Sequence, residues 1–139
     1  MRRVVVTGMG IACPLGLGVE RVWKRLVAGE SGIGAIQSFD TKELTAKIAG
    51  QVPIGTRAEG GLDLNEWIPV KDQKKMDRFI HLAVVAASEA VEDSGWVPPD
   101  EDARCATGVM IGSGIGGLGT IYEAAVMVAE GRSRRAERT

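Results

Sequence analysis

The sequence has few of the side chains that usually carry chemistry or base stacking. It holds two cysteines, one histidine and only 4% aromatic residues. Cys13 and Cys105 lie far apart, which excludes a cysteine-rich metal site or a disulfide framework and favours a reducing compartment. The one histidine, His81, lies within an expected helix, where a packed structural role is the better interpretation. The residues themselves therefore indicate no metal, no cofactor and no nucleophile with a partner base.

Long apolar runs and an excess of one charge are also missing. No apolar run reaches the length that spans a bilayer, and Val4-Val5-Val6 is too short for the core of a signal peptide. Lys and Arg total 17 against 18 for Asp and Glu, which gives a net charge of −1. This balance gives no overall attraction to nucleic acid or membrane. We therefore expect a cytoplasmic protein in which any charged binding site is a local patch.

Glycine, in contrast, is abundant, and it is densest in the stretch from Ala106 to Gly119. Val109-Met110-Ile111 is a short apolar run that predicts a buried strand. Five glycines follow among the eight residues from Gly112 to Gly119, and an apolar helical pattern that ends at Gly131 comes next. Glycine permits positive φ and the close approach of another chain. The stretch predicts a strand, a glycine turn and a helix.

The rest of the chain has the pattern of an α/β protein. We expect a buried strand over Arg3–Thr7, a helix over Val19–Ala28, a short strand over Ala46–Val52 and a long helix from about Val70 to Ser94, and we expect a turn at Gly32-Ile33-Gly34 and a charged loop over Asp100–Arg104. Alanines on the long helix imply a neighbour packed at close range. The two long strands have the pattern of strands buried on both faces, so the sheet is unfinished and we expect the chain to pair with more protein.

The segment from Gly112 to Gly117 matches the dinucleotide fingerprint G-x-G-x-x-G. That fingerprint needs a second parallel strand after the helix, with an acidic residue at its end. No such strand follows Gly131, so close packing is the favoured interpretation. A nucleotide-binding module remains as the weaker alternative.

Two basic clusters are candidates for binding. The first opens the long helix, where a spacing of three or four places its members on one helix face: Lys71, Lys74, Lys75 and Arg78. Cations at a helix N-terminus oppose the helix dipole, so a phosphate or an acidic partner helix would explain them, but on the sequence pattern alone a solvated face is the better interpretation. The second cluster lies in the tail, where composition alone indicates a solvated segment: Arg132, Arg134, Arg135 and Arg138.

Four blocks in this order resemble the N-terminal portion of the type II β-ketoacyl-acyl carrier protein synthases. They are Arg3-Val-Val-Val-Thr-Gly-Met-Gly, Trp23-Lys24 with Gly29-Glu-Ser-Gly-Ile33, Lys71-Asp-Gln-Lys-Lys-Met-Asp77, and Ile111-Gly-Ser-Gly-Ile-Gly-Gly-Leu-Gly119. The resemblance implies a partial thiolase-like fold, the N-terminal part of a layered αβαβα architecture. It also implies a homodimer in the full-length family and decarboxylative Claisen condensation of acyl and malonyl thioesters on acyl carrier protein.

The resemblance also implies roles for single residues. Lys71, Lys74 and Lys75 match the basic face that docks acyl carrier protein, Arg134 and Arg135 fall near a second basic element of that dock, and Ile115 matches a residue lining the acyl pocket.

The catalytic machinery of the family has no counterpart in this sequence. Cys13, Cys105 and His81 do not match the family's catalytic cysteine and histidines, and its catalytic lysine is also absent. Residues 1–131 are expected to form part of the synthase domain, and residues 132–139 a disordered polar tail whose end suits a frameshift, a truncation or an error in the gene model. We expect a chain that is inactive alone, or else a non-catalytic fragment that binds acyl carrier protein.

Overall fold

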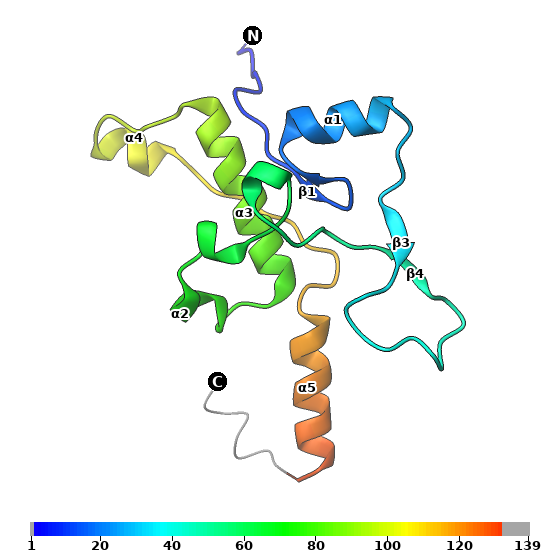
Figure 1. Cartoon of the computed structure of the whole chain (residues 1–139). Coiled ribbons are helices and arrows are strands. Elements are labelled where there is room, and N and C mark those ends of the chain that lie inside the picture. Colours follow the sequence, from blue (N-terminus) through cyan, green and yellow to red (C-terminus); the bar gives the residue numbers. More distant parts are fainter. Residues whose placement is uncertain (1, 132–139) are drawn as a thin grey trace.

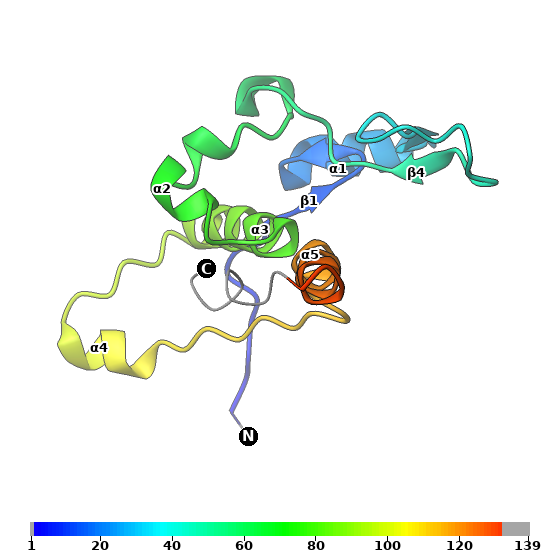
Figure 2. The ribbon, with the colours of Figure 1, turned by 90° about the horizontal axis from the view of Figure 1, so that it is seen from below.

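The computed structural model describes residues 2–131, and its elements gather around one long helix, α3 (Figure 1). In chain order the elements are β1 (Ala12–Cys13), β2 (Gly16–Leu17), α1 (Val19–Val27), β3 (Ile33–Ala35), β4 (Ile48–Gly50), the 3-10 turns η1 (Arg57–Glu59) and η2 (Leu64–Glu66), α2 (Val70–Gln73), α3 (Arg78–Ser94), α4 (Glu101–Ala106) and α5 (Leu118–Ala129). In the view along α3, α1 and the two hairpins lie on one side of this helix, whereas α5 and α4 lie on other sides of it (Figure 2).

The strands of the described residues form two small antiparallel hairpins. β1 pairs with β2, with Ala12 opposite Leu17, and β3 pairs with β4, with Gly34 opposite Ala49. The expected strand over Ala46–Val52 is confirmed as β4. The expected turn at Gly32-Ile33-Gly34 is wrong, because two of its residues belong to β3.

The two long strands predicted from sequence are not formed in residues 2–131. Arg3–Thr7 and Val109–Ile111 have no strand partner, and Val4 and Met110 are 95% and 99% exposed. A strand buried on both faces needs neighbours to satisfy its backbone and to cover its side chains. No other described segment supplies those neighbours, so the apolar runs stay unpaired at the surface.

The hydrophobic core is small and lies between α3, the β1–β2 hairpin and the segment before α2. Its buried members are Leu17, Val52, Leu62 and Val85, of which Val85 is fully buried. The chain exposes 11222 Å², whereas a compact monomer of this mass exposes roughly 6900 Å². Large apolar side chains contribute to this exposed surface, among them Val4, Val109 and Met110.

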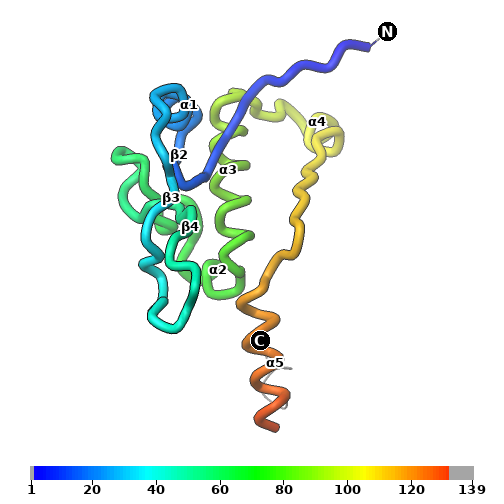
Figure 3. The backbone as a smooth tube through the Cα atoms, turned by 90° about the vertical axis from the view of Figure 1, so that its right-hand side faces the viewer, coloured from blue at the N-terminus to red at the C-terminus, as the bar shows by residue number. Residues whose placement is uncertain are grey.

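The alanine-rich face of α3 lies directly against the N-terminal segment, as expected from the small side chains. A Cβ added at Gly8 would overlap the Ala90 carbonyl, and one added at Gly10 would overlap the Ala86 carbonyl. Only glycine permits this approach. In Figure 3 the segment begins away from the other elements and crosses α3 before it reaches the β1–β2 hairpin.

Two carboxylates of α3 also hold the N-terminal segment by its backbone. The Met9 amide donates to Asp93 Oδ2 at 2.9 Å, and the Ile11 amide donates to Glu89 Oε2 at 2.9 Å. Glu89 and Asp93 are four residues apart and so lie on one helix face. Side chains thus replace the strand partner that these two amides lack.

The expected helix from Val70 to Ser94 is two helices. α2 ends at Gln73, and α3 begins at Arg78 with Asp77 as its N-cap in an extended conformation. Gly95 ends α3 with φ 62°, as expected for a left-handed C′ position.

The expectation of a charged loop over Asp100–Arg104 is wrong, because this segment is helical. It begins a short helix, α4, because the Asp100 side chain accepts a hydrogen bond from the Ala103 amide at 2.8 Å.

None of the helices in residues 2–131 combines the length and the apolar character needed for a membrane crossing.

Candidate functional site

The first candidate feature is the basic turn, which we define as Lys71, Lys74 and Lys75. Lys71 lies on α2, Lys74 is the C-cap of α2, and Lys75 lies in the connection to α3. All three side chains are exposed. The expectation of one continuous helical face that also includes Arg78 is wrong, because the chain turns between Gln73 and Arg78. The lysines lie instead on an exposed corner.

Two contacts of Gln73, the last residue of α2, hold the basic turn in place. Gln73 Nε2 donates to the Ile68 carbonyl at 2.7 Å. His81 Nε2 lies 3.0 Å from the Gln73 carbonyl, which fits the packed structural role expected for this histidine. Lys75 Nζ lies 3.4 Å from Asp72 Oδ1, an exposed pair that solvent screens and that leaves the ammonium accessible.

The second candidate feature is the glycine stretch, Gly112–Gly119, which leads into α5. A side chain at Gly112 or Gly114 would meet no atom within 4 Å, so this part of the stretch lies in the open. Ile115 is 73% exposed. Gly116 has φ 80° and lies beside the Phe79 ring, so the stretch reaches the body at the start of α3.

Asp77 joins the two features. Its Oδ1 accepts a hydrogen bond from the Arg78 amide at 2.6 Å, and its Oδ2 accepts from the Thr120 amide at 3.1 Å and the Thr120 hydroxyl at 2.8 Å. Hydrogen bonds hold the pKa of the Asp77 carboxyl below its ordinary value, and those from Thr120 have a larger effect than the one from the Arg78 amide. The basic turn ends two residues before this carboxylate, and the glycine stretch lies against it at Gly117.

Part of the signal for Asp77 is present in the sequence. An aspartate before an apolar helical pattern is typical of an N-cap. Its second partner, Thr120, lies 43 residues further along the chain, and no local pattern points to a contact of that kind.

The same carboxylate argues against the nucleotide alternative. A pyrophosphate in a G-x-G-x-x-G turn would need the free amides at the N-terminus of the following helix. Here the Thr120 amide already donates to Asp77, and a Cβ at Gly117 would lie 2.7 Å from Asp77 Oδ2. A bound phosphate would meet a negative charge.

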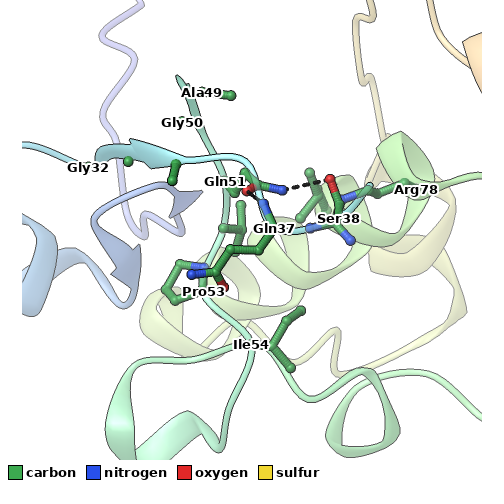
Figure 4. A pocket seen from close by; sticks show the side chains of 13 residues that line it. Gly32, Gln37, Ser38, Ala49, Gly50, Gln51, Pro53, Ile54 and Arg78 are labelled. Carbon is green, nitrogen blue, oxygen red and sulfur yellow. Dashed lines mark hydrogen bonds between the residues drawn. The ribbon is translucent and has the colours of Figure 1, made fainter. Parts of the chain in front are cut away.

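A hollow of about 730 Å³ lies between the β3–β4 hairpin and the first turns of α3 (Figure 4). Gln51 crosses one wall of it, accepting from the Gln37 amide at 2.9 Å and donating to Ser38 Oγ at 2.8 Å. Its lining includes Arg78 but neither cysteine, no histidine and no carboxylate. The hollow therefore holds no acid, base or nucleophile pair.

The remaining reactive side chains lie apart from these features. Cys13 is in β1 and Cys105 is exposed on α4, and both are unpaired. Residues 2–131 contain no group of three or more His, Cys, Asp or Glu side chains that could hold a metal ion. Arg134 and Arg135, the second element of the expected dock, lie outside the described residues.

Comparisons with known proteins agree with the four sequence blocks. Residues 1–138 match the family described as beta-ketoacyl synthase, N-terminal domain. The chain is 42% identical to 3-oxoacyl-[acyl-carrier-protein] synthase 2 of Rhizobium meliloti, covering 97% of this chain and 32% of that protein. It is also 42% identical to the mitochondrial 3-oxoacyl-[acyl-carrier-protein] synthase of Arabidopsis thaliana, covering 96% of this chain and 31% of that protein.

A solved structure gives the same result for the fold. The ishigamide ketosynthase/chain length factor superposes with a TM-score of 0.71 at 31% identity, covering 96% of this chain and 31% of that one. The expected partial thiolase-like α/β fold is therefore confirmed. The chain spans about a third of the length of the curated relatives that it matches. With a family match over nearly all of its residues, the chain belongs to the beta-ketoacyl synthases and matches their N-terminal domain.

Proposed function

We propose that this chain supplies a carrier-docking surface and part of an acyl-pocket wall for the condensation of acyl and malonyl thioesters carried on acyl carrier protein. The observation that carries the proposal is the family match over residues 1–138. Relatives at 42% identity are named as 3-oxoacyl-[acyl-carrier-protein] synthases. Because the chain covers about a third of those relatives, the condensation itself is a proposal for an assembly that includes more than these residues.

The basic turn has the chemistry that docking requires. Its three ammonium groups lie exposed on one corner, and an acidic partner would be attracted to that corner and oriented by it. The ion pair of Lys75 with Asp72 is solvent-exposed and therefore weak enough to be exchanged for a partner carboxylate. Arg134 and Arg135 remain proposed members of the same dock.

Ile115 is the proposed pocket residue. It is an exposed apolar side chain that follows Gly112 and Gly114, where an added Cβ would meet no atom within 4 Å. An apolar acyl chain would gain free energy by covering such a surface, about 25 cal/mol for each Å² removed from water. We therefore propose that Ile115 contacts the acyl chain.

The described residues offer no catalytic set, so we expect the chain to be inactive by itself. Cys105 is exposed on a helix away from the glycine stretch, and His81 is held against the Gln73 carbonyl. We also propose that the protein is located in the cytoplasm and that the full-length protein forms a dimer. We propose neither a nucleic acid nor a membrane as a partner. The second candidate function, a non-catalytic fragment that binds acyl carrier protein, rests on the same basic turn.

A titration with acyl carrier protein tests the docking claim. We expect binding that weakens as salt rises and that is abolished by Lys74→Glu with Lys75→Glu. The matched control is Lys24→Glu with Lys42→Glu, which makes the same change in net charge at two exposed lysines outside the basic turn. Equal affinity in the Lys74 and Lys75 variant, or an equal loss in the control, contradicts the proposal.

An assay of product formation from acyl- and malonyl-carrier substrates tests the expectation of inactivity. The 139-residue chain should give no product above a blank without protein. Formation of product would overturn this part of the proposal and would return Cys13 and Cys105 to consideration as nucleophiles.

A further inference from the structure

One carboxylate serves the N-termini of two helices that are distant in the sequence. Asp77 is the N-cap of α3, and its Oδ1 accepts from the Arg78 amide, the first of that helix. Its Oδ2 accepts from the Thr120 amide, which belongs to the third residue of α5. A helix N-terminus has amides without internal partners, so the same side chain caps both helices.

The cap on α5 comes from Asp77 because the local residue cannot provide one. The N-cap position of α5 is Gly117, which has no side chain and makes no side-chain cap hydrogen bond. The absence of a Cβ at Gly117 also gives Asp77 Oδ2 its room, since an added Cβ would lie 2.7 Å from that oxygen. The glycine and the aspartate are therefore complementary parts of one junction.

The junction attaches the end of the glycine stretch to the start of α3. Gly112 and Gly114 face open space, Gly116 lies beside Phe79, and Gly117 lies against Asp77. Figure 3 shows this segment running along α3 and reaching the start of that helix just before α5 begins. The position of Ile115, two residues before Gly117, is thus set by Phe79 and Asp77.

We propose that Asp77 is a positioning residue that couples the basic turn to Ile115. Lys74 and Lys75 precede it by three and two residues, so a partner that pulls on the basic turn moves the N-cap of α3. The same carboxylate then carries that movement to α5 and to the glycine stretch. This inference rests on the proposed function, because it takes the basic turn as the dock and Ile115 as a pocket residue.

Asp77→Asn breaks one half of the junction and keeps the other. Asparagine is as good an N-cap as aspartate, so its oxygen still accepts from the Arg78 amide. Its second terminal atom is an NH₂ group, which cannot accept from the Thr120 amide. Asp72→Asn is the matched control, since it makes the same change of charge beside the basic turn without touching Thr120.

The experiment follows Ile115 by NMR in the 139-residue chain with 15N-labelled isoleucine, while unlabelled acyl carrier protein is added. The Ile115 signal is identified by its loss in Ile115→Val. In the unaltered chain we expect this signal to shift in step with docking. In Asp77→Asn we expect docking affinity within about twofold, because the α3 cap is kept, and loss of most of the Ile115 shift. The buried Ile68 signal reports whether the variant is folded.

The remaining variants and outcomes separate the two claims. Asp72→Asn should keep the full Ile115 shift, and Thr120→Val, which removes only the hydroxyl donor, should fall between the two. An undiminished shift in both Asp77→Asn and Thr120→Val, or carrier binding with no Ile115 shift in the unaltered chain, overturns the coupling and leaves docking intact. Failure of the carrier to bind overturns the proposed function and the coupling with it.

Discussion

Asp77 Oδ2 lies 2.8 Å from the Thr120 hydroxyl and 3.1 Å from the Thr120 amide, and both groups donate to it. This contact joins the start of α3 to the first turn of α5 across 43 residues of sequence. Because the donors favour the ionised carboxylate, the contact gives the junction a dependence on pH. The basic turn ends at Lys75, two residues before Asp77.

The first prediction concerns acid. Hydrogen bonds from Thr120 and from the Arg78 amide lower the pKa of Asp77, and the charge of His81 lowers it further. In the unfolded chain this carboxyl titrates near pH 3.9, at roughly its reference value. The stabilisation that Asp77 contributes is therefore fully present above that pH and is lost as the pH falls through the lower folded pKa.

Thermal unfolding followed by circular dichroism checks this sign. The unfolding midpoint of the unaltered chain should fall more steeply below about pH 4 than that of Asp77→Asn, which has no carboxyl to protonate there. Glu59, whose pKa is also lowered, by its hydrogen bonds with Thr56, is present in both proteins and cancels from the comparison. Parallel curves for the two proteins would contradict the prediction.

The elements that follow from local sequence were predicted well. α1 has apolar residues at helical spacing and ends before Gly29, which has φ 73°. α3 ends at Gly95 and α5 is followed by Gly131, both with positive φ. Each of these ends depends on a glycine conformation that neighbours in the sequence determine. The break before Asp77 was not predicted. The helical spacing of apolar residues continues through this region, so the sequence pattern favoured one long helix over two helices with Asp77 as a cap.

The elements that depend on distant partners could not be predicted in the same way. Val4–Val6 and Val109–Ile111 have strand composition, but a strand forms only where another strand satisfies its backbone. In residues 2–131 the N-terminal segment instead lies against α3, held by Glu89 and Asp93. The same reasoning explains the site: the lysines and Ile115 were identified from the sequence, whereas Asp77 was placed inside one continuous helix. Its contact with Thr120 lies 43 residues further along the chain, where no local pattern points to it.

The second prediction concerns the approach of the N-terminal segment to α3. Gly10→Ala places a Cβ into the Ala86 carbonyl and the Ala90 amide, and overpacking of this kind costs about 1–3 kcal/mol. Amide hydrogen exchange at Met9 and Ile11 should accelerate, because their hydrogen bonds to Asp93 and Glu89 are lost together. Gly34→Ala is the control, since its Cβ meets no atom within 4 Å. Unchanged exchange in Gly10→Ala would contradict the close packing.

The third prediction concerns the small core. Val85 is fully buried on α3, and removing its two methyl groups should lower the free energy of unfolding by about 2 kcal/mol, from lost transfer energy and the cavity left behind. Val91→Ala is the matched control, because Val91 lies on the same helix but is 56% exposed, and it should cost less than about 0.5 kcal/mol. Urea denaturation measures both. Equal losses would mean that Val85 is not in a packed core.

The fourth prediction concerns the unpaired apolar run Val109–Ile111. Contiguous exposed apolar residues with unpaired backbone groups are a template for association with another chain, so we expect the chain to self-associate as its concentration rises. Val109→Thr with Met110→Gln should weaken this association in sedimentation velocity experiments. Ile54→Thr with Val97→Thr, two side chains that are also exposed but lie apart in the sequence, should weaken it less, because isolated apolar residues form no continuous template. An equal effect of both pairs would assign the association to total apolar surface, and a monomer with a sharply cooperative unfolding transition would contradict it altogether.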